Sequence, residues 1–354
     1  MSIASPQIQP PLTASRPQAE AAATRMQATR RAVAHLIEVG ARLLALAAIV
    51  IFFGAKIGPG FYSAGNLESI LIQSAVYAMG GLGMTMIIIT GGIDLAAGST
   101  IALAMTVTAM VLNHPGTDVW YWQMLAVLAG VGSAVAVGAI QGSLITALRV
   151  VPFIVTLGGL VTVRGFVKQI AHNEEINPTP GWIYRHLMFQ VQGAEFNWQL
   201  FPVGVWATIA AAIIAAAVLR YTKFGRRVYA IGSNEATARL CGIPVQRTKL
   251  MVYAVGGLFF GLAGVLEFSK LNIGQPTGAV MYGLYIIAAC VIGGTSLNGG
   301  VGSIFGTVIG ALIIGVLYAG AQQSFWPKQV QEMAIGVIII AAVALDQLRM
   351  RRKV

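Results

Sequence analysis

One carboxylate stands in an otherwise apolar stretch of this sequence, and glycines flank it. The run Ile89-Thr90-Gly91-Gly92-Ile93-Asp94-Leu95-Ala96-Ala97-Gly98-Ser99 interrupts a mainly apolar region that extends from residue 74 to residue 112. A charged side chain at the centre of a membrane costs about 2.5 kcal/mol or more, so the surrounding structure must compensate for it. Paired glycines let the backbone unwind, which inside a membrane occurs only where protein or a water-filled cavity surrounds it. The stretch therefore predicts a broken helix on a transport path.

Asp94 has two interpretations. Its carboxylate could line the solute path, or it could accept backbone N–H bonds at the start of the next helix, where the helix dipole favours an anion. One carboxylate cannot give a solute site its specificity, which favours the second role. In either case we expect the broken helix to involve Gly91, Gly92, Asp94, Gly98 and Ser99.

A second glycine break follows about 200 residues later. The run Val291-Ile292-Gly293-Gly294-Thr295-Ser296-Leu297 matches 89–95, and both runs then reach a Gly-Ser pair, Gly98-Ser99 and Gly302-Ser303. Broken elements at corresponding positions of two halves are a good sequence indicator of a transport path. We expect Gly293, Gly294, Thr295 and Ser296 to form the second break, with Ser296 opposite Asp94. Chance similarity between glycine-rich membrane helices is the alternative.

The most polar internal segment, 220–249, carries a different kind of motif. Asn234 and Glu235 can cap a short helix, whose small apolar face would fit a groove on a partner protein; that face comprises Ala236, Ala238, Leu240 and Cys241. Arg239, with Arg226 and Arg227, could contact acidic residues of the partner. Alternatively, these arginines only orient the protein in the membrane.

These motifs must be positioned by membrane helices. Ten apolar segments indicate an all-α, polytopic membrane protein, and the eighth is short for a full crossing. Nine of them cover approximately 36–56, 67–89, 95–112, 120–149, 201–219, 251–268, 282–292, 301–320 and 331–345, and the fifth starts at Pro152. Together they define a transmembrane domain at 36–348.

Composition agrees with this class. The chain is 56% hydrophobic and 10% charged, with a mean hydropathy of +0.75, whereas soluble domains carry about 25% charged residues. Seven of the 23 basic residues lie in 220–249, and four more lie among the last six residues. The positive-inside rule places both segments in the cytoplasm, together with a disordered tail at 1–35 and a basic tail at 349–354. The net charge of +11 is not gathered with aromatics, so we expect no nucleic-acid binding.

Three motifs together resemble the ribose/galactose-type sugar permeases of bacterial ABC importers. They are the Thr90–Ser99 run, the segment 232–243, and Gly293-Gly294-Thr295-Ser296-Leu297-Asn298-Gly299-Gly300; Tyr229-Ala230-Ile231, Gln275-Pro276-Thr277 and Arg164-Gly165 add to the resemblance. It implies an inner-membrane permease with about ten helices, similar in fold to vitamin B12-type importers. It also implies a homodimer, a separate ATP-binding cassette ATPase and a periplasmic binding protein.

The resemblance implies roles for residues as well. Coupling to the ATPase would fall to Asn234, Glu235, Ala236, Arg239, Leu240 and Gly242, and no catalytic residue, metal or cofactor is expected. One departure from the family is Tyr282-Gly283-Leu284-Tyr285, where many members carry acidic residues. This departure makes a polyol or a less common sugar as plausible a solute as ribose.

Two other classes were weighed. An ion-coupled secondary transporter of a small polar solute would need acids or histidines deep in its spans, but Asp94 is the one acid expected there. The histidines, His35, His114, His172 and His186, all fall at span ends or in loops. An intramembrane enzyme would need a nucleophile and a base at depth, and no such pair is present in the spans.

Gly302, Gly306 and Gly310 share one helix face, which indicates close helix packing. Packing within the chain is favoured over a dimer seam.

Overall fold

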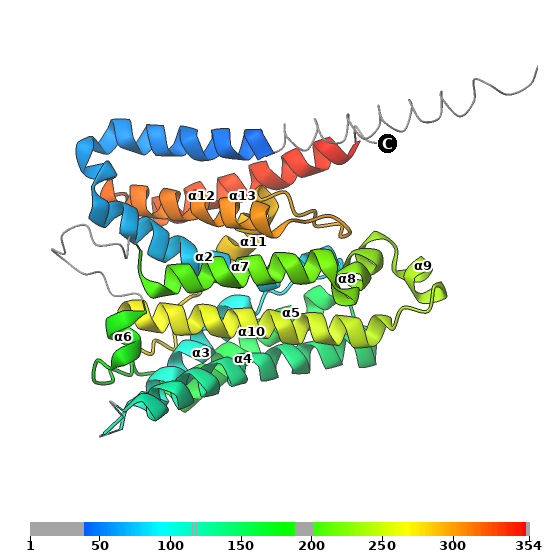
Figure 1. Ribbon diagram of the computed structural model, residues 1–354, viewed down its shortest axis with the longest axis horizontal. Helices are drawn as coiled ribbons and strands as arrows, with labels where there is room; N and C mark the ends of the chain where they lie inside the picture. Colours follow the sequence, from blue (N-terminus) through cyan, green and yellow to red (C-terminus); the bar gives the residue numbers. More distant parts are fainter. Residues whose placement is uncertain (1–38, 115, 118, 188–200, 352–354) are drawn as a thin grey trace, which may run out of the picture.

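The computed structural model describes residues 39–351 except 115, 118 and 188–200 (Figure 1). The predicted tail at 1–35 therefore lies outside the described residues. The described part is helical, and its one β feature is an isolated bridge between Ile176 and Gly274. The helices are Val39–Ile57, followed by η1 Pro59–Tyr62, α2 Ala64–Ile89, α3 Ala97–Leu112, α4 Trp120–Leu148, α5 Pro152–Ile170, α6 Trp182–His186, α7 Val203–Tyr221, α8 Lys223–Ser233, α9 Glu235–Leu240, α10 Val245–Leu271, α11 Tyr282–Ile292, α12 Ile304–Gln323 and α13 Lys328–Arg351.

Each of the ten predicted apolar segments coincides with a helix. Seven helices among the described residues are long and apolar enough to cross a membrane: Val39–Ile57, α2, α4, α5, α7, α10 and α12. α3 and α11 are shorter, with 16 and 11 residues, so the predicted shortness of the eighth segment is confirmed. The predicted segment 220–249 is mostly helical, because α8, α9 and the start of α10 occupy it. α13 extends to Arg351, so it includes part of the predicted tail at 349–354.

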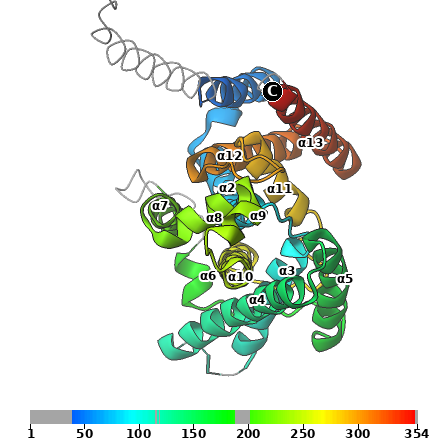
Figure 2. The same ribbon diagram turned by 90° about the vertical axis from the view of Figure 1, so that its right-hand side faces the viewer.

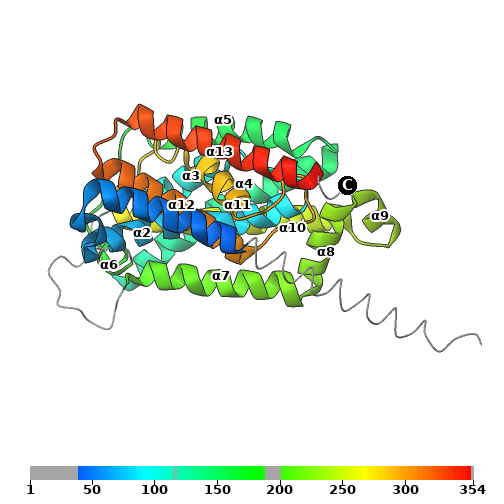
Figure 3. The same ribbon diagram turned by 90° about the horizontal axis from the view of Figure 1, so that it is seen from above.

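α2 is the central helix of the bundle. Its entire most apolar 18-residue window is buried, against 17–33% of the corresponding windows in Val39–Ile57, α4, α5 and α7. Seen end on, α10 lies near the middle with α5 and α7 on opposite sides (Figure 2), and the view from above separates these two helices in the same way (Figure 3). The less buried helices thus supply the apolar outer surface that lipid requires, while α2 packs against protein along nearly all of its length from Ile70 to Ile89.

Small residues let α2 approach its neighbours closely. A Cβ on Gly83 would lie 2.9 Å from the Cα of Gly256 and 3.0 Å from its carbonyl oxygen, so α2 and α10 touch through their backbones. On another face, Thr85 Oγ1 lies 2.6 Å from Thr307 Oγ1 of α12 and donates to the Gly81 carbonyl at 2.7 Å. Small side chains of this kind are how membrane helices gain packing energy without a hydrophobic driving force.

The Gly302, Gly306 and Gly310 face packs within the chain. A Cβ on Gly306 would overlap the Gly293 carbonyl, and one on Gly310 would overlap the Ala289 carbonyl. A Cβ on Gly302 would lie 2.6 Å from the Ile89 side chain. This face therefore seats α12 and the loop before it against α11 and the end of α2, which is the favoured of the two interpretations.

A matched pair of glycines tests the α2–α10 contact. We expect Gly83→Ala to destabilise the protein by about 1–3 kcal/mol, because the added methyl group meets backbone atoms that cannot move aside. Gly132→Ala in α4 is the control, since nothing lies within 4 Å of its Cβ position. Thermal unfolding of detergent-purified protein should show a lower midpoint for Gly83→Ala alone. Equal midpoints for the two variants would contradict this packing.

Candidate translocation and coupling site

The first glycine break is a helix C-terminus closed by a Schellman-type cap. Gly91 adopts φ +78°, which is costly for other residues, and its N–H donates to the Ile88 carbonyl at 2.9 Å. The Gly92 N–H reaches back to the Ile87 carbonyl at 3.1 Å. These two bonds satisfy carbonyls that the end of α2 would otherwise leave unpaired.

The second break has the same cap. Gly294 adopts φ +83°, its N–H donates to the Val291 carbonyl at 2.8 Å, and the Thr295 N–H donates to the Cys290 carbonyl at 2.9 Å. Gly91 therefore corresponds to Gly294. The sequence alignment, which paired Gly91 with Gly293, is wrong by one residue, because a Gly-Gly pair can be matched in two registers and only one glycine takes the left-handed position. By the corrected register Leu297, not Ser296, stands opposite Asp94.

The two capped helices run side by side in the same direction. Tyr77 of α2 stacks edge-on against Tyr282 at 5.2 Å between ring centroids, and further along the same two helices Thr85 Oγ1 lies 3.4 Å from Cys290 Sγ. Because the contacting residues advance in the same direction along both helices, α2 and α11 are parallel. A shared direction is what two copies of one broken element, at corresponding positions of the two halves, require.

Asp94 holds the turn between the first break and α3. It is 1% exposed, and its Oδ1 accepts the Ala96 N–H at 2.8 Å, immediately before α3 begins at Ala97. Thr156 Oγ1 donates to the neighbouring Ile93 carbonyl at 3.1 Å, which fixes the same turn against α5. This geometry is that of a helix anchor.

Gly98 and Ser99 serve as packing positions. A Cβ on Gly98 would lie 2.5 Å from the Ala279 carbonyl oxygen, so α3 starts directly against the segment that leads into α11. Ser99 Oγ donates to the Leu160 carbonyl of α5 at 2.9 Å. The buried residues of the second break behave similarly, with the Ser296 N–H donating to the Val301 carbonyl at 3.0 Å.

Arg42 lies at the second break, and sequence reasoning missed this role. A Cβ on Gly294 would overlap its guanidinium, and one on Gly306 would lie 2.9 Å from Arg42 Nη1. The cation therefore sits at the carboxyl end of α11, where the helix dipole favours positive charge. An arginine at the entry of an apolar helix is a weak signal, because such residues usually extend to the interface.

The end of α8 meets both breaks at one point. The Gly300 N–H donates to the Ile89 carbonyl at 2.8 Å, joining the end of α2 to the loop after α11. A Cβ on Gly232 would overlap that same carbonyl and lie 2.5 Å from the Gly300 nitrogen. Tyr229 of α8 adds a bond from its hydroxyl to the Gly302 carbonyl at 2.9 Å. We call this contact of Gly232, Ile89 and Gly300 the backbone junction.

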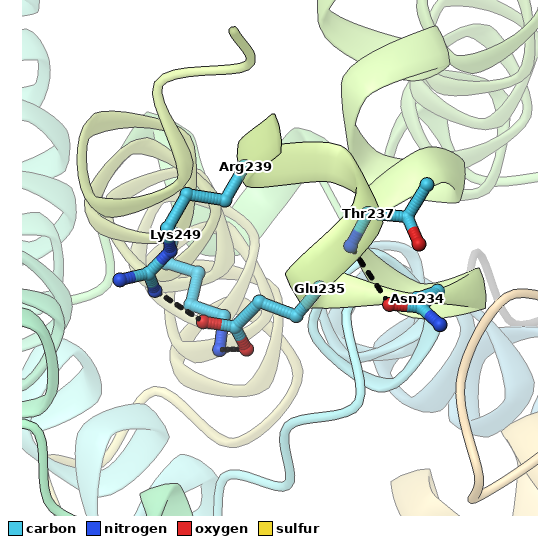
Figure 4. Close-up of polar contacts among 5 residues, drawn as sticks. All are labelled: Asn234, Glu235, Thr237, Arg239 and Lys249. Carbon is cyan, nitrogen blue, oxygen red and sulfur yellow. Dashed lines mark hydrogen bonds and ion pairs between the residues drawn. The ribbon is translucent and has the colours of Figure 1, made fainter. Parts of the chain in front are cut away.

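α9 is fixed to the bundle by its own polar groups (Figure 4). Asn234 is the N-cap and accepts the Thr237 N–H at 2.9 Å, as predicted. Glu235 binds Arg239 at 3.0 Å and Lys249 of α10 at 2.6 Å. Partial burial raises the pKa of Glu235, but the hydrogen bonds and charges of Lys249 and Arg239 outweigh it and hold that pKa below its ordinary value.

The exposed surface of α9 differs from the partner-binding surface predicted for it. Leu240 is 89% exposed, and Ala236, Cys241 and Gly242 are exposed beside it. Ala238 is wrong as a partner contact: it is 4% exposed and packs in a small core with Ile231 and Val245. Arg239 forms an ion pair with Glu235 of the same chain. Gly242, at φ +77°, closes α9 with a left-handed turn.

Two further residues matter. Arg164 Nη1 donates to the Gly278 carbonyl at 2.5 Å, so two motifs that are far apart in the sequence, Arg164-Gly165 and Gln275-Pro276-Thr277, lie close together in the fold. Glu267 of α10 is 3% exposed, so the protein buries a second acid besides Asp94. The predicted span ended at residue 268, one residue after Glu267, whereas α10 continues to Leu271.

The buried central helix, the two capped breaks and the external α8–α9 unit define a membrane-embedded transport subunit. The family model described as "Branched-chain amino acid transport system / permease component" matches residues 66–343, and the chain belongs to that family. It is therefore a transport permease and not an enzyme.

Curated relatives cover most of the chain. The ribose import permease protein RbsC of Escherichia coli K12 is 37% identical over 86% of this chain and 91% of its own length. The L-arabinose transport system permease protein AraH of the same strain is 32% identical over 88% and 91%. The galactose/methyl galactoside import permease protein MglC of Salmonella typhimurium is 35% identical over 88% and 94%. Comparison with solved structures gives no significant match.

The anchoring role of Asp94 can be tested by what each substitution retains. Asp94→Ala removes the acceptor and leaves the buried Ala96 N–H unpaired, which we expect to cost about 1–3 kcal/mol. Asp94→Asn keeps an oxygen acceptor, so its unfolding midpoint should fall between those of the wild type and Asp94→Ala, with sugar preference unchanged. Normal stability in both variants together with an altered sugar preference would instead favour the interpretation in which Asp94 lines the solute path.

Proposed function

We propose that this protein is the permease subunit of an ATP-driven importer for a monosaccharide or a related polyol. What supports the solute class is the extent of similarity to permeases named for ribose, arabinose and galactose, each aligned over more than 90% of its own length. The departure at Tyr282-Gly283-Leu284-Tyr285 leaves a polyol or a rarer sugar in contention.

The importer would contain two copies of this chain, a separate ATP-binding cassette ATPase and a periplasmic solute-binding protein. The ATPase would bind the α8–α9 side, and the binding protein would bind the opposite end of the bundle. The basic residues of 220–249 support an inner-membrane orientation with this side and both chain termini in the cytoplasm. A likeness to the vitamin B12-type fold stays an expectation.

The backbone junction supports a mechanism of coupling. Leu240 at the exposed end of α9 would enter a groove of the ATPase, and movement of that subunit would displace α9 and α8 together, since the Asn234 cap joins them. Gly232 has no side chain to absorb the displacement, so it would act directly on the Ile89 carbonyl and on Gly300. One external movement would thus reach both breaks.

The driving force separates this function from ion coupling. In vesicles that contain the permease, the ATPase and the binding protein, we expect uptake of radiolabelled D-ribose, L-arabinose or D-galactose to require both ATP and the binding protein. A protonophore should leave the uptake unchanged. Uptake that persists without ATP, or that stops when the proton gradient collapses, would contradict the proposal.

Leu240 offers a test of the docking surface. We expect Leu240→Asp to leave the protein inserted and folded, because the side chain is 89% exposed and contributes little to the core. A charge at the centre of a buried interface should reduce ATPase binding and uptake by about tenfold or more. Leu240→Met, which keeps an apolar side chain at the same position, is the control. Normal uptake in Leu240→Asp, measured at equal protein abundance, would rule out this surface.

A further inference from the structure

A buried polar cluster lies at the other end of the helices that carry the glycine breaks. It comprises Gln73 and Tyr77 of α2, Glu267 and Lys270 of α10, and Tyr282 of α11; we call it the tyrosine–glutamate cluster. Gln73, Tyr77 and Glu267 are 4%, 0% and 3% exposed. An acid and an amide at such depth are expensive, so their presence needs an explanation.

Most polar atoms of the cluster bind one another. Tyr282 Oη donates to Glu267 Oε1 at 2.8 Å, and Lys270 Nζ lies 3.4 Å from the same oxygen. Lys270 Nζ also donates to Gln73 Oε1 at 2.5 Å. These contacts tie α2, α10 and α11 together, and they hold Glu267 with one oxygen satisfied.

Three atoms of the cluster remain unpaired. Gln73 Nε2, Tyr77 Oη and Glu267 Oε2 are buried and have no hydrogen-bond partner within the described part of the chain. A helix-packing network would not need them, because phenylalanine at 77 would fill the same space without the cost of a buried hydroxyl. Buried polar atoms without partners are uncommon in folded proteins, and three of them gathered in one cluster point to a ligand.

The chemistry of the cluster matches a hydroxyl-rich solute. A carboxylate oxygen accepts bonds from sugar hydroxyls, an ammonium group donates to them, and a phenol can do either. Three aromatic rings lie together here, with Tyr77 at 5.2 Å from Tyr282 and 5.7 Å from Tyr285. Aromatic surface with a few convergent polar groups is the usual composition of a small-molecule site. A metal cation fits less well, because Lys270 already places a positive charge beside the carboxylate.

We propose that the tyrosine–glutamate cluster is a low-affinity binding subsite for a monosaccharide or polyol, occupied as the solute passes through the permease. The proposal rests on the proposed function and adds to it a site of selection within the membrane. Bound solute would pair Gln73 Nε2, Tyr77 Oη and Glu267 Oε2, and it would replace contacts such as that between Lys270 and Gln73.

The position of the cluster connects this subsite to the coupling machinery. Tyr77 lies twelve residues before Ile89 on the same helix, a distance of about 18 Å at 1.5 Å per residue. Tyr282 lies at the start of α11, whose other end is the second break. A movement of α2 and α11 that begins at the backbone junction would therefore also change the separation of Tyr77, Glu267 and Tyr282.

Direct binding to the intact permease tests the subsite. Purified protein in lipid nanodiscs is mixed in turn with D-ribose, L-arabinose and D-galactose, and saturation-transfer NMR measures contact with each sugar. Tyr77→Phe and Glu267→Gln each remove one unpaired group and preserve side-chain size. We expect the transfer signal of the favoured sugar to fall about 3- to 10-fold in each variant, the loss of one hydrogen bond. Tyr121→Phe and Glu174→Gln, changed at exposed residues, should match the wild type.

The outcomes separate this inference from the proposed function. Equal signals in wild type, Tyr77→Phe and Glu267→Gln, or no signal in the wild type, would overturn the subsite, whereas ATP-dependent uptake in vesicles would still support the importer. Loss of signal in Tyr77→Phe and Glu267→Gln with unfolding midpoints near that of the wild type would support the subsite. Loss only in a variant whose midpoint also collapses would count against it, since a packing role would then account for the effect.

Discussion

The contact that the rest of the structure depends on is the backbone junction, where main-chain atoms of three segments meet without intervening side chains. The Gly300 N–H bonds to the Ile89 carbonyl, and Gly232 lies against both. Flexible side chains can change rotamer and dissipate a displacement, but main-chain atoms in contact cannot. The ends of α2, α8 and the loop after α11 must therefore move together or separate.

A second constraint comes from the burial of α2 from Ile70 to Ile89. Polar groups on a helix enclosed by protein cost free energy unless its neighbours satisfy them. Thr85 meets Thr307 and Cys290, and Ser63 caps the first turn by accepting the Asn66 N–H at 3.4 Å. The breaks follow the same rule, since each Schellman-type cap pairs the last carbonyls of its helix. Thr85 and the caps thus help to specify the neighbours of α2, whereas Gln73 Nε2, Ser74 Oγ and Tyr77 Oη have no hydrogen-bond partner within the described residues.

Much of the fold could be predicted from the sequence, because apolar length and the positions of glycine report directly on membrane helices. All ten apolar segments and the cap at Asn234 follow from residue type alone. The register of the two breaks did not, since Gly293 and Gly294 are chemically identical and only the backbone distinguishes them. Ala238 was misassigned for a related reason: periodicity on a helix as short as α9 cannot show which face the core covers. The burial of Glu267 was missed because its partner Tyr282 lies beyond the turn after α10, and its packing against α2 is a tertiary contact. The meeting of three motifs at one junction is likewise a tertiary fact, which no local pattern contains.

The two cysteines have a practical consequence. Cys241 is exposed at the end of α9, whereas Cys290 is buried between α2, α11 and α12. A thiol-reactive spin label would therefore attach at one natural position per chain without any substitution. Two copies of the chain would place two labels on the same side of the membrane, and the separation between them would report both on pairing and on how far the α9 ends travel during a transport cycle.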